Sequence, residues 1–126
     1  MTWTLLHERM AFMAQLIQVA ETDPEGALAL AGATSEVSRL FGDEEGLLLS
    51  LAQRWITMLV AKLDQASHEC APAEEVRAEF AAAEPGLHAL VAIGSRRSLR
   101  VRALSRGGHV AADLFGGPTG DRQTVA

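Results

Sequence analysis

The chain has 126 residues, which is enough for one domain with its own hydrophobic core. Hydrophobic residues make up 48% of it and charged residues 21%, a balance that excludes a wholly disordered chain. The formal net charge is −5, and the single cysteine, Cys70, excludes an internal disulfide framework. No basic run precedes an apolar core at the N-terminus, so we expect a soluble, cytoplasmic protein.

The first third of the chain predicts one long helix followed by two short ones. Thr4 is a suitable N-cap for a helix that runs to about Glu21. Its apolar residues form a broad arc: Leu5, Leu6, Met10, Phe12, Met13, Leu16, Ile17, Val19 and Ala20. Pro24 ends this helix and, with Asp23 as N-cap, starts a short helix to about residue 31. Another brief helix then stops at Gly42.

Residues 46–66 predict a central helix that is apolar on nearly every side, with Asp43 as its cap. Its polar residues form only a narrow stripe: Ser50, Gln53, Arg54, Thr57, Asp64 and Gln65. A helix of this kind must be surrounded by other helices or by a second chain. Its apolar run, Leu47–Leu63, is too short for a membrane span and carries Gln53, Arg54 and Lys62, each costly in hydrocarbon, so we do not expect it to cross a membrane.

The last third of the chain also reads as helical. Pro72 starts a helix to about Ala83 with a single apolar stripe, and Pro85 separates it from the next apolar segment, 86–106. Whether Gly94 and Ser95 divide that segment into two helices is left open by the pattern. Together these elements predict an all-α fold, a compact bundle of four to five main helices with short connecting helices. We expect residues 1–117 to form one domain and residues 118–126 a mobile tail.

An apolar pocket is one candidate for a functional site. Arg54 lies midway along the most apolar helix, where a charge needs a partner, an exit to water or an anionic ligand. Methionine adapts to irregular apolar shapes, so methionines near this arginine are candidates for a pocket lining. The predicted ligand-binding residues are Arg54, Trp55, Met58, Met10 and Met13. The alternative is that these side chains belong to the ordinary core.

A basic patch is the second candidate. Residues 1–95 hold five basic and fourteen acidic side chains (−9), whereas residues 96–126 hold six basic and two acidic ones (+4). The patch consists of Arg96, Arg97, Arg100, Arg102 and Arg106. Such arginines can bind nucleic-acid phosphates. The alternative, which we favour, is that they lie against acidic helices such as Glu74 to Glu84, within one chain or across a dimer.

Metal and catalytic sites receive little support from the sequence. His68 and Cys70 are two residues apart, and both are good zinc or copper ligands, but no spacing presents two such ligands on one helix face. We therefore expect His68 to be an ordinary surface histidine and Cys70 a half-buried thiol. No nucleophile motif is present either, so we predict no metal, no cofactor and a non-enzymatic protein.

The leading prediction is a helical module, homodimeric, that acts in protein–protein interaction or regulation. It depends on the apolar surfaces of segments 5–20 and 47–63, which exceed what one small bundle is expected to cover. One alternative is a small-molecule-binding protein or minor enzyme with an apolar pocket near Trp55 and Arg54. A second alternative is nucleic-acid contact through residues 96–106. We expect no membrane partner.

Overall fold

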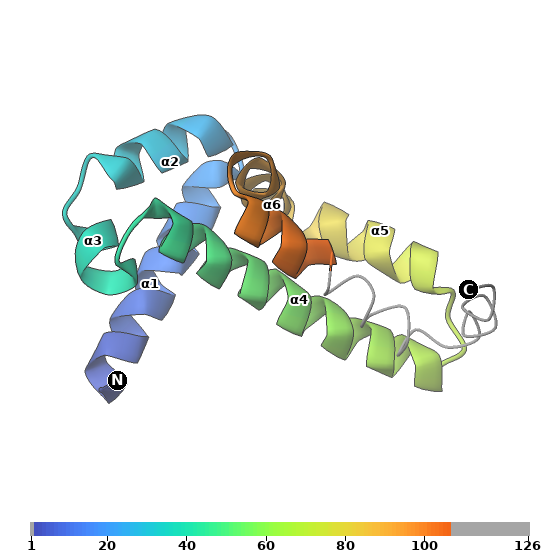
Figure 1. Cartoon of the computed structure of the whole chain (residues 1–126). Coiled ribbons are helices and arrows are strands. Elements are labelled where there is room, and N and C mark those ends of the chain that lie inside the picture. The colour runs from blue at the N-terminus through green and yellow to red at the C-terminus, as the bar shows by residue number, and fades with distance from the viewer. Residues whose placement is uncertain (1, 107–126) are drawn as a thin grey trace.

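Six helices follow one another in the computed structural model, which describes residues 2–106 (Figure 1). They are α1 (Trp3–Ala20), α2 (Pro24–Gly32), α3 (Glu36–Phe41), α4 (Glu44–His68), α5 (Ala73–Ala83) and α6 (Pro85–Arg97). A further helical segment spans 99–106. Residues 2–106 contain no strand, which confirms the predicted all-α fold. The predicted tail and the end of the predicted domain lie outside the described residues.

The helix starts follow from local capping. The Asp23 and Asp43 carboxylates accept hydrogen bonds from the backbone N–H groups of Gly26 (3.0 Å) and Gly46 (2.7 Å), as predicted. The predicted cap of the first helix is wrong. Thr2, not Thr4, accepts a hydrogen bond from Leu5 N (3.1 Å), and α1 therefore includes Trp3.

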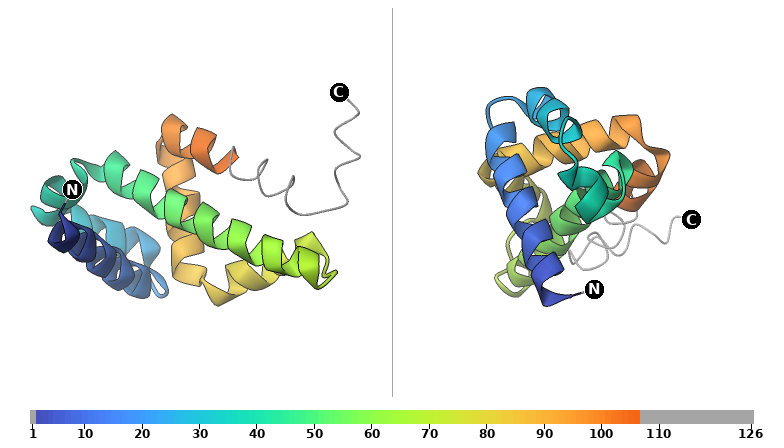
Figure 2. Two further views of the ribbon diagram at one scale, coloured as in Figure 1. Left: turned by 90° about the horizontal axis from the view of Figure 1, so that it is seen from below. Right: turned by 90° about the vertical axis from the view of Figure 1, so that its left-hand side faces the viewer.

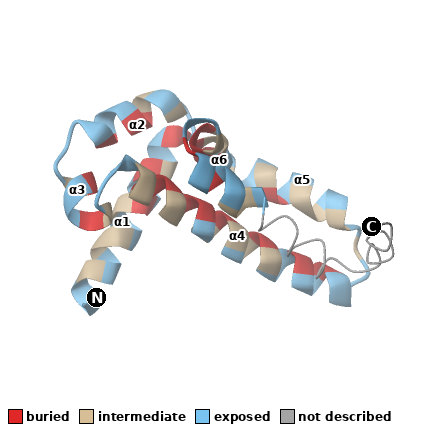
Figure 3. Cartoon of the chain, viewed as in Figure 1, coloured by how far each residue is buried: buried red, intermediate tan, exposed pale blue. Residues whose placement is uncertain are grey.

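Helix α4 is the central element, as its composition predicts. It runs the length of the molecule, with α1, α2 and α3 gathered near its first half and α5 alongside its second half (Figure 2). Its buried residues are Leu47, Leu48, Leu51, Ala52, Trp55, Leu59, Leu63 and Ala66, and they face α3, α5 and α6. The predicted polar stripe is the opposite side of the helix, where Gln53, Thr57 and Asp64 are exposed (Figure 3).

The expectation that this segment is too short for a membrane span is wrong, because α4 has 25 residues. By length and composition it is the one helix among residues 2–106 that could span a membrane. Core helices of water-soluble proteins meet the same criterion, and eight α4 residues are buried against the rest of the chain. The cytoplasmic location stays a prediction.

Close helix packing joins α6 to α1. Gly86, in the first turn of α6, is buried, and a Cβ atom there would overlap the carbonyl oxygen of Ile17 in α1. The glycine thus lets the two backbones approach each other. Helix α6 also packs on α4 and α2, so it covers the second half of α1 and the first half of α4 together.

Segment 86–106 forms two helices, and the break is at Ser98 rather than at Gly94–Ser95. Ser98 has an extended backbone, and its hydroxyl oxygen accepts a hydrogen bond from Val101 N (3.2 Å), which caps the segment 99–106. The same hydroxyl donates to the Glu45 carboxylate (2.6 Å). Gly94 is buried inside α6, where an added Cβ would lie close to Val101 and Leu48.

Candidate functional site

A continuous apolar stripe runs along α1 with alternating spacings of three and four residues. It consists of Trp3, Leu6, Met10, Met13, Ile17 and Ala20. This spacing keeps the stripe on one side of a helix and is typical of the seam between two packed helices. None of the six positions carries a charge. The stripe is therefore suited to burial along its whole length.

Only the second half of this stripe is covered. Met13 and Ala20 are buried and Ile17 is half-buried, because α6 packs there. The first half is open: the exposed fractions are 71% for Trp3, 37% for Leu6 and 42% for Met10. We call these three residues the outer α1 face. Figure 1 shows the corresponding end of α1 projecting from the rest of the molecule.

The helix that carries the outer α1 face is held firmly at its middle. Arg9 Nε donates to the carbonyl oxygen of Leu40 (2.6 Å) at the end of α3. Arg39 of α3 forms ion pairs with Glu8 of α1 (2.9 Å) and with Glu36 (2.6 Å). Hydrogen bonding to Arg39 lowers the pKa of Glu36, and these carboxylates raise the pKa of Arg39. The open face is thus presented on a helix that its own chain positions.

A groove lies on another side of α1, against α2. Its volume is about 300 Å³, and it is lined by Phe12, Gln15, Leu16, Val19, Ala27, Leu30, Ala31 and Thr34. Leu30 of α2, at its rim, is 66% exposed. Helix α1 therefore has two apolar surfaces, and an experiment must distinguish them.

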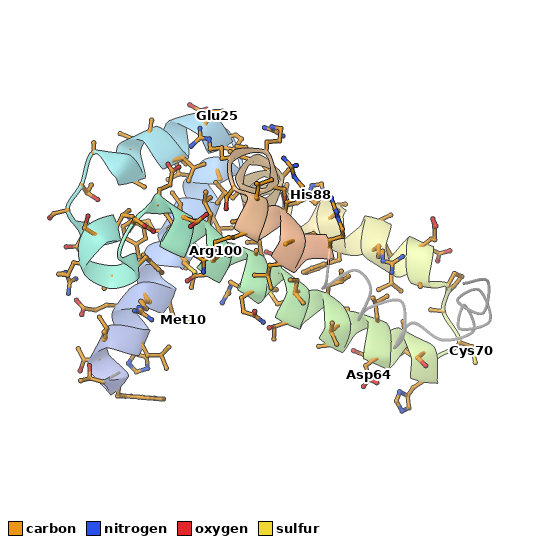
Figure 4. All side chains as sticks on the ribbon, in the orientation of Figure 1. Met10, Glu25, Asp64, Cys70, His88 and Arg100 are labelled. Atoms are coloured by element: carbon orange, nitrogen blue, oxygen red, sulfur yellow. The ribbon has the colours of Figure 1, made fainter. Side chains whose placement is uncertain are left out.

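The predicted ligand-binding residues are not brought together around one cavity. Arg54 Nη1 lies 3.9 Å from Met10 Sδ, on the side of α4 that faces α1 (Figure 4 labels Met10). Trp55 points the other way and stacks on Phe80 of α5, with ring centroids 4.4 Å apart. Met13 is buried and Met58 is half-buried. A cavity does adjoin Trp55, and of the five predicted residues only Trp55 lines it.

The basic patch pairs with acids inside the chain, although not with the acids that we expected. Arg97 bridges Glu25 (2.7 Å) and Glu44 (3.2 Å), and Arg100 pairs with Glu45 (3.2 Å). Figure 4 labels Glu25 and Arg100. These carboxylates belong to the first turns of α2 and α4. The expected partners, Glu74 to Glu84, lie in and after α5 instead.

The other three arginines of the patch are placed as follows. Arg96 lies 3.9 Å from Glu25. Arg102 Nε donates to the carbonyl oxygen of Ser95 (3.0 Å). Arg106 is exposed at the end of the described residues. The ion pairs of Arg97 thus join the C-terminal end of α6 to the first turns of α2 and α4.

His68 is the last residue of α4, and Cys70 lies in the turn that follows it. His68 Nδ1 lies 2.9 Å from the Asp64 carbonyl oxygen. Cys70 is exposed, so its predicted half-burial is wrong, and it has a left-handed backbone (φ 57°). Among residues 2–106, no group of three or more His, Cys, Asp or Glu side chains could hold a metal ion.

Sequence reasoning missed two kinds of residue. The predicted cap at Thr4 leaves Trp3 outside the first helix, although the spacing of Trp3 from Leu6 and Met10 continues the α1 stripe and indicates a helical position. His88, Ser95 and Ser105, which line the Trp55 cavity, had no local signal, because they meet only when α6 and segment 99–106 fold together.

Comparisons of the chain with protein-family models, with curated proteins and with solved structures find no match. The features that bear on function are therefore the outer α1 face, the paired arginines and the cavity beside Trp55.

Proposed function

We propose that the protein is a non-enzymatic helical module that acts through protein–protein contact, and that its first contact is with a second copy of itself. The observation that carries the proposal is the outer α1 face. Three large apolar side chains, Trp3, Leu6 and Met10, are open to water in succession on one stripe. An exposed apolar surface of this kind is typical of an interaction site.

The spacing of the stripe favours a helix as its occupant. Residues at alternating spacings of three and four pack as knobs into the holes of a facing helix. In the second half of α1 the same stripe already packs on α6. A partner helix would continue that mode of packing over Trp3, Leu6 and Met10.

A second copy of the chain meets this requirement most simply. Two identical stripes can pair antiparallel about a two-fold axis, which is the common arrangement of soluble homodimers. The three residues of the outer α1 face carry no charge themselves, and the nearest cation is Arg54, whose Nη1 lies 3.9 Å from Met10 Sδ. Regulation or scaffolding of other proteins would then be a property of the dimer.

Nucleic-acid contact has less support. Arg97 and Arg100 already pair with carboxylates, and any phosphate must displace Glu25, Glu44 or Glu45 from them. The acidic remainder of the chain would also repel a phosphate backbone. If this alternative held, binding would be strongly salt-dependent and lost when these arginines become alanine.

The test is the molar mass in solution at micromolar concentration, measured by size-exclusion chromatography with light scattering. We expect the wild-type chain at twice the 13.4 kDa of one copy. The variant Leu6→Glu/Met10→Glu places two charges on the outer α1 face and should elute at 13.4 kDa. Glutamate is a good helix former, so α1 itself should persist, as circular dichroism can verify.

Leu30→Glu is the control for a leucine-to-glutamate change elsewhere, because it adds one negative charge at an exposed leucine on the α1–α2 groove. It should leave the mass doubled. A wild-type chain of 13.4 kDa contradicts self-association. If Leu30→Glu dissociates the dimer and the double variant does not, the dimer interface lies at the α1–α2 groove instead of the outer α1 face.

A further inference from the structure

A cavity of about 170 Å³ lies between α4, α6 and the helical segment 99–106. Six side chains line it: Trp55, His88, Val91, Ala92, Ser95 and Ser105. Figure 4 labels His88 on α6. No residue of α1 contributes, so the cavity and the outer α1 face are separate features.

One wall of the cavity is a fixed aromatic surface. The Trp55 indole stacks on Phe80, with ring centroids 4.4 Å apart and planes at 28°, and the His88 ring lies 5.2 Å from it. Trp55 and Phe80 are both buried. The indole is therefore held in place before any ligand arrives, which reduces the entropy lost on binding.

The polar groups of the cavity are neutral hydroxyls and one imidazole. Ser95 Oγ and Ser105 Oγ lie 3.5 Å apart, at the long limit of a hydrogen bond. A hydroxyl donates once and can accept twice, so this pair has capacity for a further partner. None of the six lining residues is Asp, Glu, Lys or Arg. Arg54 is not among them, so the lining itself offers an anionic ligand no guanidinium or ammonium group.

Size and chemistry together define the ligand. An apolar protein cavity of ~150 Å³ is large enough to bind benzene. We propose that the cavity beside Trp55 binds a neutral single-ring aromatic molecule with one hydrogen-bonding group, of the phenol class. The ring packs against Trp55, Val91 and Ala92, and the hydroxyl exchanges hydrogen bonds with Ser95 and Ser105.

Titration of three probes of similar size tests the ligand class: phenol, toluene and benzoate. Trp55 fluorescence reports binding in the variant Trp3→Phe, which leaves Trp55 as the only tryptophan. Phenol should change the emission saturably. Toluene should bind on the order of fivefold more weakly, because it lacks one hydrogen bond, and benzoate should not saturate. No saturable change with phenol, or equal affinity for phenol and benzoate, overturns the proposal.

Two sets of variants place the binding in this cavity. Ala92→Leu fills it and should abolish phenol binding, whereas Ala89→Leu, the same change outside the lining on α6, should not. Ser95→Ala/Ser105→Ala should remove the preference for phenol over toluene and keep toluene binding. This second variant tests the same cavity even if Ala92→Leu does not fold. Phenol binding unchanged in Ala92→Leu, or a preference unchanged in the serine variant, contradicts the assignment. Neither result depends on self-association.

Discussion

Helices α1 and α4 both carry unusually broad apolar surfaces, but their surroundings differ. Helix α4 packs on α3, α5 and α6, which bury eight of its residues and leave its polar side exposed. Helix α1 is enclosed by α2 and α6 over its second half, whereas Trp3, Leu6 and Met10 stay open to water. The two helices thus differ in how far their own chain covers them.

This difference shows that apolar character alone does not decide whether a helix surface is buried. Each apolar surface needs an opposing element, and the short helices of this chain supply one for α4. For the first turns of α1 the contacts include those of Glu8, Arg9 and Met10 with α3 and α4, and they leave Trp3 and much of Leu6 and Met10 exposed. The remaining apolar surface is available to another molecule.

The largest expected effect compares one leucine from each helix. Leu51→Ala in α4 removes a side chain with no exposed surface and should lower the free energy of unfolding by about 2–5 kcal/mol. Leu6→Ala in α1 should lower it by less than about 1 kcal/mol in dilute protein, where dimers dissociate. Urea unfolding measures both. Equal losses would mean that the chain covers the outer α1 face after all.

A second pair of variants tests how α6 covers the second half of α1. Gly86→Ala places a Cβ against the Ile17 carbonyl oxygen and should cost about 1–3 kcal/mol in unfolding free energy. Gly32→Ala in α2 meets no atom within 4 Å and should gain about 0.4–1 kcal/mol. Thermal unfolding of the two variants gives the comparison. A neutral Gly86→Ala would contradict the close approach of α1 and α6.

A smaller effect concerns the C-terminal end of α4, where the chain turns toward α5. Ala71 N bonds to Ala66 O (2.9 Å) and Cys70 N to Ser67 O (3.3 Å), the two bonds of a Schellman motif. Cys70 occupies its left-handed position, where glycine is preferred. Cys70→Gly should therefore raise the unfolding free energy by up to about 1 kcal/mol. A loss of stability in urea unfolding would show that the Cys70 side chain has a role of its own.

The smallest expected effect is a dependence on pH at the contact between α1 and α3. The Arg39 hydrogen bond lowers the pKa of Glu36 from 4.5. Glu36 therefore binds protons more weakly in the folded state, and its contribution to stability is present above pH 4.5 and is lost as the pH falls through the lowered value. Arg39→Gln should flatten this part of the stability profile slightly. If the melting temperature of Arg39→Gln depends on acidic pH in the same way as that of the wild type, the pair contributes nothing to stability.

Local signals predicted most of the fold. Helix ends depend on a few neighbouring residues, and three of them are where the sequence predicts. Asp23 and Asp43 cap the starts of α2 and α4, and Gly42 ends α3. The central helix was also predictable, because its polar residues form so narrow a stripe. The break at Ser98 was not, since it depends partly on a hydrogen bond to Glu45, which lies far away in the sequence.

Positions of side chains in space were less predictable. The arginines of the basic patch meet Glu25, Glu44 and Glu45 because α6 ends beside the starts of α2 and α4. Nothing in the spacing favoured these acids over Glu74 to Glu84. Arg54 and Trp55 are adjacent in sequence, yet they point to different helices, so they could not share one pocket as predicted.

Trp3 itself offers the most direct test of the central claim, that a second copy covers the outer α1 face. In the variant Trp55→Phe it is the only tryptophan, and it is 71% exposed in the single chain. We predict that its fluorescence is blue-shifted at high protein concentration and moves to the red on dilution, as the dimer dissociates and Trp3 enters water. A red emission that is the same at every concentration would contradict the claim.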